Sequence, residues 1–234
     1  MIFNSLVIMN EADKHPDYKK LYQIACKYFK KRHYFCSGPL DETFFTLRVF
    51  ESAKEIIKLL PEKVKKEEVL TATLFHDIGK SKIDIKKVIT IKGWAKNPDE
   101  EWHKHPKLSA ELAKPVLKKL GHSEEFIKEV CYLIENHDKR EGFKGKKPLE
   151  LKIVQDADYI GDTGVAGFIR PFLWSGKFKR SVIEQLQYMK TSTNSRLELS
   201  KINLEVSKEL IKKNAKIEEE LKNNMLELID SELI

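Results

Sequence analysis

The residues from Leu70 to Lys80 offer the clearest chemistry in the sequence. A helix-forming, apolar run ends in His76 and Asp77, and Gly79 follows. Glycine fits the left-handed position that closes many helices, so we expect the pair in the last helical turn. Neighbours on a helix point about 100° apart, so both side chains reach one metal ion only near the helix end. A single His-Asp pair is weak evidence and needs partners.

Two further polar residues interrupt apolar stripes. His137 continues the spacing of Ile127, Val130 and Ile134, and Asp158 shares a helical face with Leu151. A buried imidazole or carboxylate without a partner is costly. Each alone is typical of a hydrogen-bonded core residue, but several on separate helices favour a metal centre. The mixed N/O set suits Mn, Fe, Co, Ni or Zn, and the chemistry is metal-assisted hydrolysis.

The apolar periodicity predicts helices throughout. Val88–Ile91 is a short strand or part of a loop, and Asp41 is expected to begin a helix. The expected helices cover 17–31, 41–60, 67–78, 106–120, 123–137, 151–160 and 181–229, the last broken near 191–195. We therefore expect an all-α helical bundle with a C-terminal helical extension. Residues 1–180 would form the metal-binding domain, and the helices of 181–234 would pack on it or form a homodimer.

Composition excludes several classes of protein. The 43 basic and 36 acidic residues of the 234-residue chain are interleaved, so a net charge of +7 indicates a Lys/Glu-rich surface rather than a nucleic-acid site. The three cysteines, at 26, 36 and 131, are too few and too far apart for a disulfide framework or a zinc site. They fit the reducing cytoplasm. No apolar run, including Met1–Met9, is long enough to cross a membrane.

Taken together, these motifs resemble those of the HD-domain metal-dependent phosphohydrolase superfamily. The matching segments are His76-Asp77-Ile-Gly-Lys80, His105-Pro-x-x-Ser-Ala, His137 and Ala157-Asp158. The similarity runs from about residue 41 to about 215. Within it, 156–170 and 187–196 are similar to uncharacterised HD hydrolases.

The resemblance implies a role for each matching residue. His76, Asp77 and Asp158 would bind a first metal ion, and Asp77 would bridge to a second ion held by His105 and His137. Lys80 would meet a substrate phosphate, or be a solvated lysine. His103 and Asp138 are spare ligand candidates, Asp156 orients a ligand or is a surface carboxylate, and Arg48 and Arg170 meet substrate or form structural ion pairs.

One departure from the family pattern concerns the first metal ion. The family has a histidine ligand three residues before the dipeptide Arg48-Val49, and this chain has Phe45 there. Glu42, one turn earlier, or His33 substitutes for it, or the site works with an extra water or mainly through the second ion. Otherwise hydrolysis has been lost and a binding role kept.

Three functions follow. The first is a metal-dependent phosphohydrolase acting on a nucleotide or another phosphoester, with Asp77 and Lys80 as catalytic residues. The second is a catalytically silent HD domain that binds a nucleotide or a partner protein. The third, a basic nucleic-acid-binding protein, lacks any zinc finger or RNA-binding signature.

Overall fold

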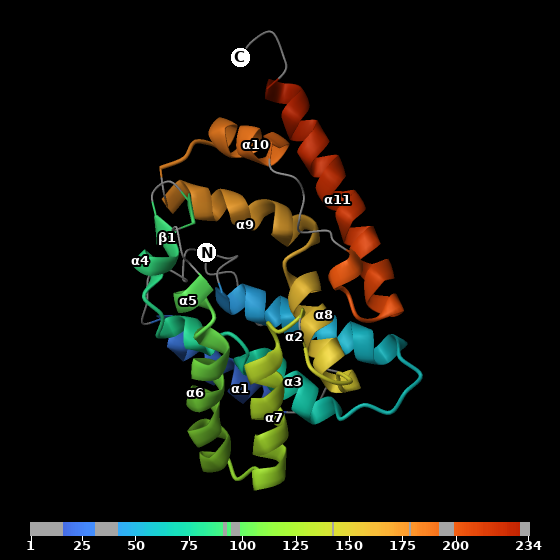
Figure 1. The fold of residues 1–234 in the computed structure, drawn as a ribbon. Coiled ribbons are helices and arrows are strands. Elements are labelled where there is room, and N and C mark those ends of the chain that lie inside the picture. Colours follow the sequence, from blue (N-terminus) through green and yellow to red (C-terminus); the bar gives the residue numbers. More distant parts are fainter. Residues whose placement is uncertain are drawn as a thin grey trace.

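A computed structural model describes residues 16–30, 42–90, 93–94, 99–141, 143–177, 179–191 and 199–229. Helices make up nearly all of this part of the chain, which confirms the all-α prediction (Figure 1). The main helices are α1 (Pro16–Lys30), α2 (Glu42–Leu59), α3 (Lys66–Phe75), α6 (His105–Lys119), α7 (Glu124–Asn136), α8 (Leu149–Gly161), α9 (Gly164–Lys177), α10 (Val182–Thr191) and α11 (Glu205–Ile229).

Shorter elements join these helices. They are the 3-10 turns η2 (Ile78–Ser81) and η4 (Leu199–Lys201), the short helices α4 (Ile85–Val88) and α5 (Asp99–Trp102), and the strands β1 (Ile89–Thr90) and β2 (Gly93–Trp94). The two strands pair antiparallel, which decides between the strand and the loop expected near Val88–Ile91. Two expectations, the helix start at Asp41 and the break after Thr191, lie outside the described residues.

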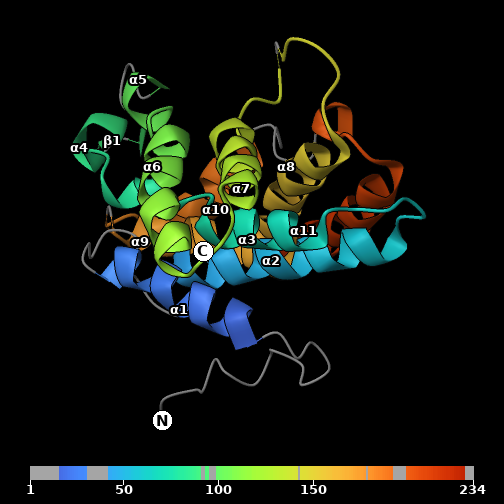
Figure 2. The same ribbon diagram turned by 90° about the horizontal axis from the view of Figure 1, so that it is seen from below.

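Helix α3 is the centre of the bundle. Every residue from Val69 to Ile78 is buried, which is typical of a helix surrounded by others. It packs against α1, α2, α7 and α8, and Figure 2 shows α1 and α2 along one side of it. Its buried end carries His76, so packing on several sides fixes the position of the predicted ligands.

The helix pair α6 and α7 packs on η2 and α3 from another side. Gly121, with φ of +85°, ends this hairpin's first helix in the left-handed conformation. Ser123 begins the second helix as its N-cap, accepting a hydrogen bond from the backbone N–H of Phe126 at 3.2 Å. These local signals bring His105, at the start of α6, close to His137, at the end of α7.

The C-terminal helices α9, α10 and α11 pack on one another, and α11 also contacts α8 and α2 (Figure 1). Asp156 anchors the start of α11 by accepting hydrogen bonds from the backbone N–H groups of Asn203 and Leu204, both at 2.9 Å. This corrects both expectations for Asp156, because the carboxylate is fully buried and binds backbone rather than a ligand. Among the described residues, no helix has the length and hydropathy to cross a membrane.

Candidate metal centre

The three buried histidines share one local arrangement. In each, Nδ1 lies 2.7 Å from the carbonyl oxygen three residues earlier: Thr73 for His76, Trp102 for His105 and Ile134 for His137. A carbonyl oxygen only accepts, so Nδ1 carries the proton of a neutral ring and Nε2 carries the free lone pair. This is the orientation of histidines that bind metals through Nε2. His76 Nε2 is buried and makes no hydrogen bond.

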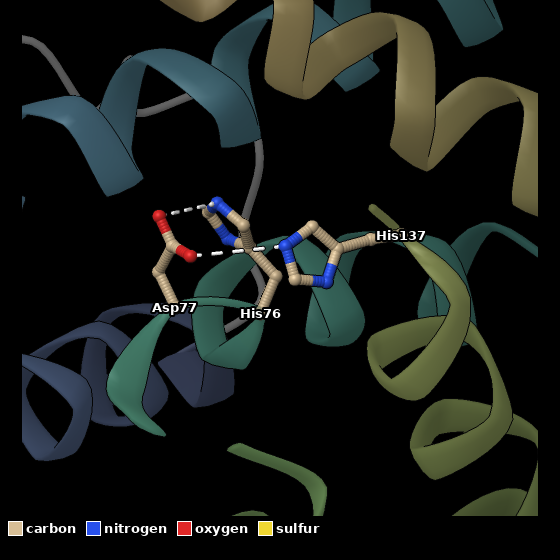
Figure 3. Close-up of side chains that lie close together, drawn as sticks. All are labelled: His76, Asp77 and His137. Atoms are coloured by element: carbon tan, nitrogen blue, oxygen red, sulfur yellow. Dashed lines mark ion pairs between the residues drawn. The ribbon is translucent and has the colours of Figure 1, made fainter. Parts of the chain in front are cut away.

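Asp77 connects the three rings. Its Oδ2 lies 3.2 Å from His76 Nε2, and its Oδ1 lies 3.2 Å from His105 Nε2 and 3.7 Å from His137 Nε2. Figure 3 shows how the two oxygens point to different imidazoles. The carboxylate is therefore placed as a bridge between two ligand groups, as the resemblance implies.

Asp158 extends the first ligand group, which contains His76 and Asp77. Its Oδ1 lies 3.4 Å from His76 Nε2, and its Oδ2 accepts a hydrogen bond from Arg140 at 2.8 Å. Sequence reasoning did not single out Arg140, because its partner lies on another helix and no local pattern joins the two.

Asp138 extends the second ligand group, which contains Asp77, His105 and His137. Its Oδ2 lies 3.3 Å from His105 Nε2, its Oδ1 lies 3.6 Å from His137 Nε2, and the two imidazole Nε2 atoms are 3.4 Å apart. His103, the other spare candidate, is exposed and belongs to neither group.

The spacing of these atoms fits a transition-metal ion. Metal–ligand bonds of about 2.1 Å in a tetrahedral site place the ligand atoms about 3.4 Å apart. The atoms of His76, Asp77 and His137, and those of His105, His137 and Asp138, each lie within 4.8 Å of one another. Together with the unpartnered Nε2 of His76, this geometry fits a divalent cation bound by imidazoles and carboxylates.

The pKa values show how strongly this site attracts positive charge. Burial lowers the pKa of His76, but Asp77 and Asp158 outweigh burial and raise it to about 10. Burial lowers the pKa of His137, so this ring is neutral and available as a ligand. A proton on His76 and a metal ion would therefore compete for the same lone pair.

Phe45 lies beside the first group, at the position where the family has a histidine. Its ring centroid is 5.9 Å from that of His76, and Arg170 Cζ lies 4.2 Å from the Phe45 centroid. Lys80 Nζ lies 5.5 Å from the same centroid. The ring therefore packs against two cations and supplies no ligand atom.

Glu42 binds those cations and no described histidine. Its Oε2 lies 3.3 Å from Lys80 Nζ and its Oε1 lies 3.0 Å from Arg170 Nη2. Glu42 thus faces the site as expected, but its oxygens pair with Lys80 and Arg170 and not with a histidine of the site. His33, the alternative substitute, lies outside the described residues.

Lys80 corrects the expectation of a solvated lysine. It is 6% exposed, and its Nζ lies 2.5 Å from Asp77 Oδ2. Burial lowers its pKa, but Asp77 and Glu42 outweigh burial and hold the pKa above the usual value, so Lys80 is charged. Arg170 also forms an ion pair, with Asp162 at 2.7 Å, whereas Arg48 donates to the carbonyl oxygens of Gly161 and Thr163.

Gly79 does not adopt the left-handed conformation that the sequence predicted for it, so this expectation is wrong. It is required by close approach: a Cβ there would lie 2.2 Å from the carbonyl oxygen of His105 and 2.5 Å from the backbone nitrogen of Ser109. Its own N–H donates to Ser109 Oγ at 2.8 Å. Gly79 therefore lets η2 contact α6, which brings Asp77 next to His105.

Comparisons with known proteins identify the class. Residues 46–161 match the HD domain family. A search of proteins with curated functions found no match. Among solved structures, a predicted HD superfamily hydrolase from an uncultured Thermotogales bacterium is 21% identical over 89% of this chain and 90% of its own, with a TM-score of 0.56.

Two Bacillus structures show the same fold. YpgQ of Bacillus subtilis, in complex with ADP, is 19% identical over 92% of this chain and 98% of its own, with a TM-score of 0.59. An HD-superfamily hydrolase from Bacillus thuringiensis is 16% identical over 92% of this chain and 98% of its own, with a TM-score of 0.60. The protein described here contains an HD domain over residues 46–161 and has the fold of these three structures.

Proposed function

We propose that this chain is a metal-dependent phosphohydrolase that acts on a nucleotide or another phosphoester. The observation that carries the proposal is the convergence of three buried imidazole Nε2 atoms on the carboxylate of Asp77. The nucleotide part rests on the ADP bound to Bacillus subtilis YpgQ, which has a similar fold. The proposed ion is a divalent transition metal, Mn, Fe, Co, Ni or Zn.

When bound, such an ion supplies a Lewis acid that lowers the pKa of a water molecule from 15.7 toward ~7 and neutralises charge on a phosphoryl group. One or two such ions would be held by two candidate ligand sets that share Asp77: His76, Asp77 and Asp158, and Asp77, His105 and His137. The chain's own contribution is orientation: three backbone carbonyls hold the imidazoles, and Asp77 is fixed between them. Lys80 adds a positive charge 2.5 Å from Asp77 Oδ2, where it would stabilise negative charge on a phosphoryl group.

The test is phosphate release by protein purified without chelator. The substrates are nucleoside mono-, di- and triphosphates and a phosphodiester, each with Mn²⁺, Co²⁺ or Ni²⁺. We expect metal-dependent release from at least one compound and its loss in His105→Ala and Asp77→Ala. The matched control is His103→Ala, which removes an exposed histidine near His105 and should retain the activity.

Phe45 favours a second candidate, a silent HD domain that binds a nucleotide without hydrolysing it. It predicts nucleotide binding by calorimetry with no phosphate release under any of the three metals. Turnover by the unmodified chain that disappears in Asp77→Ala would eliminate this candidate. Release that persists in Asp77→Ala would instead refute the phosphohydrolase proposal.

A further inference from the structure

Asp138 is better placed to bind a metal than its position after His137 suggested. Its two oxygens lie 3.3 Å from His105 Nε2 and 3.6 Å from His137 Nε2. With Asp77 Oδ1, which lies 3.2 Å from His105 Nε2, these groups offer four ligands. The separations between these carboxylate oxygens and the imidazole Nε2 atoms, 3.2 to 3.7 Å, are close to the ~3.4 Å expected between ligands of one tetrahedral ion. We call Asp77, His105, His137 and Asp138 the second cluster.

The first cluster is made of His76, Asp77 and Asp158. His76 Nε2 lies 3.2 Å from Asp77 Oδ2 and 3.4 Å from Asp158 Oδ1, but the neighbours of this cluster are different. Arg140 donates to Asp158 Oδ2 at 2.8 Å, and Lys80 Nζ lies 2.5 Å from Asp77 Oδ2. Each carboxylate of this cluster thus already faces a cation. No described lysine or arginine lies within ion-pair distance of Asp138.

The charges around both clusters can be counted along a chain of contacts within ion-pair distance. Five carboxylates face three cationic side chains. The carboxylates are Glu42, Asp77, Asp138, Asp158 and Asp162, and the cations are Lys80, Arg140 and Arg170. Two of the cations, Lys80 and Arg140, lie at the first cluster. A second ion there would add positive charge beside carboxylates that are already paired, in largely buried surroundings, which is unfavourable.

We propose that this chain holds a single divalent transition-metal ion, bound in the second cluster with Asp138 as a ligand. Lys80 and Arg140 supply the positive charge at the first cluster that another ion would supply there. Phe45 offers no ligand atom, which is consistent with the absence of an ion from the first cluster. The inference rests on the proposed metal-dependent function, and it concerns where the ion binds and how many bind.

The test is titration of the metal-free full chain with Co²⁺, followed by equilibrium dialysis and by the visible absorption of the bound ion. We expect one tightly bound Co²⁺ per chain, with the intense bands of a tetrahedral site. Two tightly bound ions in the unmodified protein would overturn the proposal. This measurement needs no variant, so it holds even where a substitution impairs folding.

A pair of matched variants then locates the ion. We expect Asp138→Asn to weaken Co²⁺ binding by about 10–100-fold and to shift the absorption bands. Asp158→Asn should retain one Co²⁺ per chain, with an affinity within about threefold of the unmodified protein and unchanged bands. The reverse result, with Asp158→Asn losing the ion and Asp138→Asn keeping it, would refute the assignment. Circular dichroism of the metal-free variants checks that both are folded.

The same titration separates this inference from the proposed function. One Co²⁺ in the second cluster without phosphate release from any compound would support the inference and remove the phosphohydrolase proposal. Phosphate release that requires two bound ions would support hydrolysis and overturn the inference.

Discussion

Replacing Gly79 with alanine should displace the metal ligands as well as destabilise the fold. The added Cβ would lie 2.2 Å from the backbone oxygen of His105 and 2.5 Å from the backbone nitrogen of Ser109, so η2 and α6 must separate. Overpacking costs about 1–3 kcal/mol, and losing the Gly79 N–H to Ser109 Oγ bond adds about 1 kcal/mol. For a chain of this size, the sum of about 2–4 kcal/mol lowers Tm by roughly 4–16 °C.

The assay is thermal unfolding of the metal-free protein, followed by Co²⁺ binding at a temperature where the variant is folded. Gly176→Ala is the matched control, because a Cβ there meets nothing within 4 Å and its backbone is not left-handed. It should change the free energy of unfolding by less than about 1 kcal/mol. A Gly79→Ala protein with unchanged Tm and unchanged Co²⁺ affinity would refute the argument that close approach of η2 and α6 builds the site.

Three other changes test separate parts of the structure. Glu42→Gln removes the carboxylate shared by Lys80 and Arg170. Measured by urea unfolding, it should lower the free energy of unfolding by about 2–3 kcal/mol. The loss is smaller than for a fully broken buried pair because each cation keeps another carboxylate. Asp156→Asn turns an amide N–H₂ group toward the N–H donors of 203–204, and should increase hydrogen exchange at the start of α11; unchanged exchange would contradict the anchoring role. Free metal at 100 times its Kd should stabilise the chain by about 2.7 kcal/mol, so chelation should lower Tm by roughly 5–11 °C, and no shift would mean no specific site.

The sequence was sufficient to predict the helices that hold the site. Periodic apolar residues placed His137 and Asp158 on inward faces. His137 is buried and Asp158 is half-buried, because local spacing decides which side of a helix is packed. The continuous apolar run before His76 likewise identified a central helix. These predictions depend on neighbours in the sequence, and such information is local.

The contacts across the bundle could not be predicted in this way. The pairing of Glu42 with Arg170 joins α2 to α9, and that of Arg140 with Asp158 crosses to α8, so no local pattern indicates either. The sequence predicts the left-handed conformation of a helix end for Gly79, whereas the reason for this glycine lies in the backbone of another helix. Burial of Lys80 depends on the same tertiary contacts.

The central claim, that His105, His137 and the neighbouring carboxylates converge on a cation, is tested most directly by a crystal structure of the Co²⁺-loaded protein. Data collected at the cobalt edge locate the ion through its anomalous scattering. We predict one anomalous peak about 2.0–2.3 Å from the Nε2 atoms of His105 and His137 and from a carboxylate oxygen of Asp77. A loaded crystal with no peak among these side chains, or with its only peak elsewhere on the chain, would contradict the account.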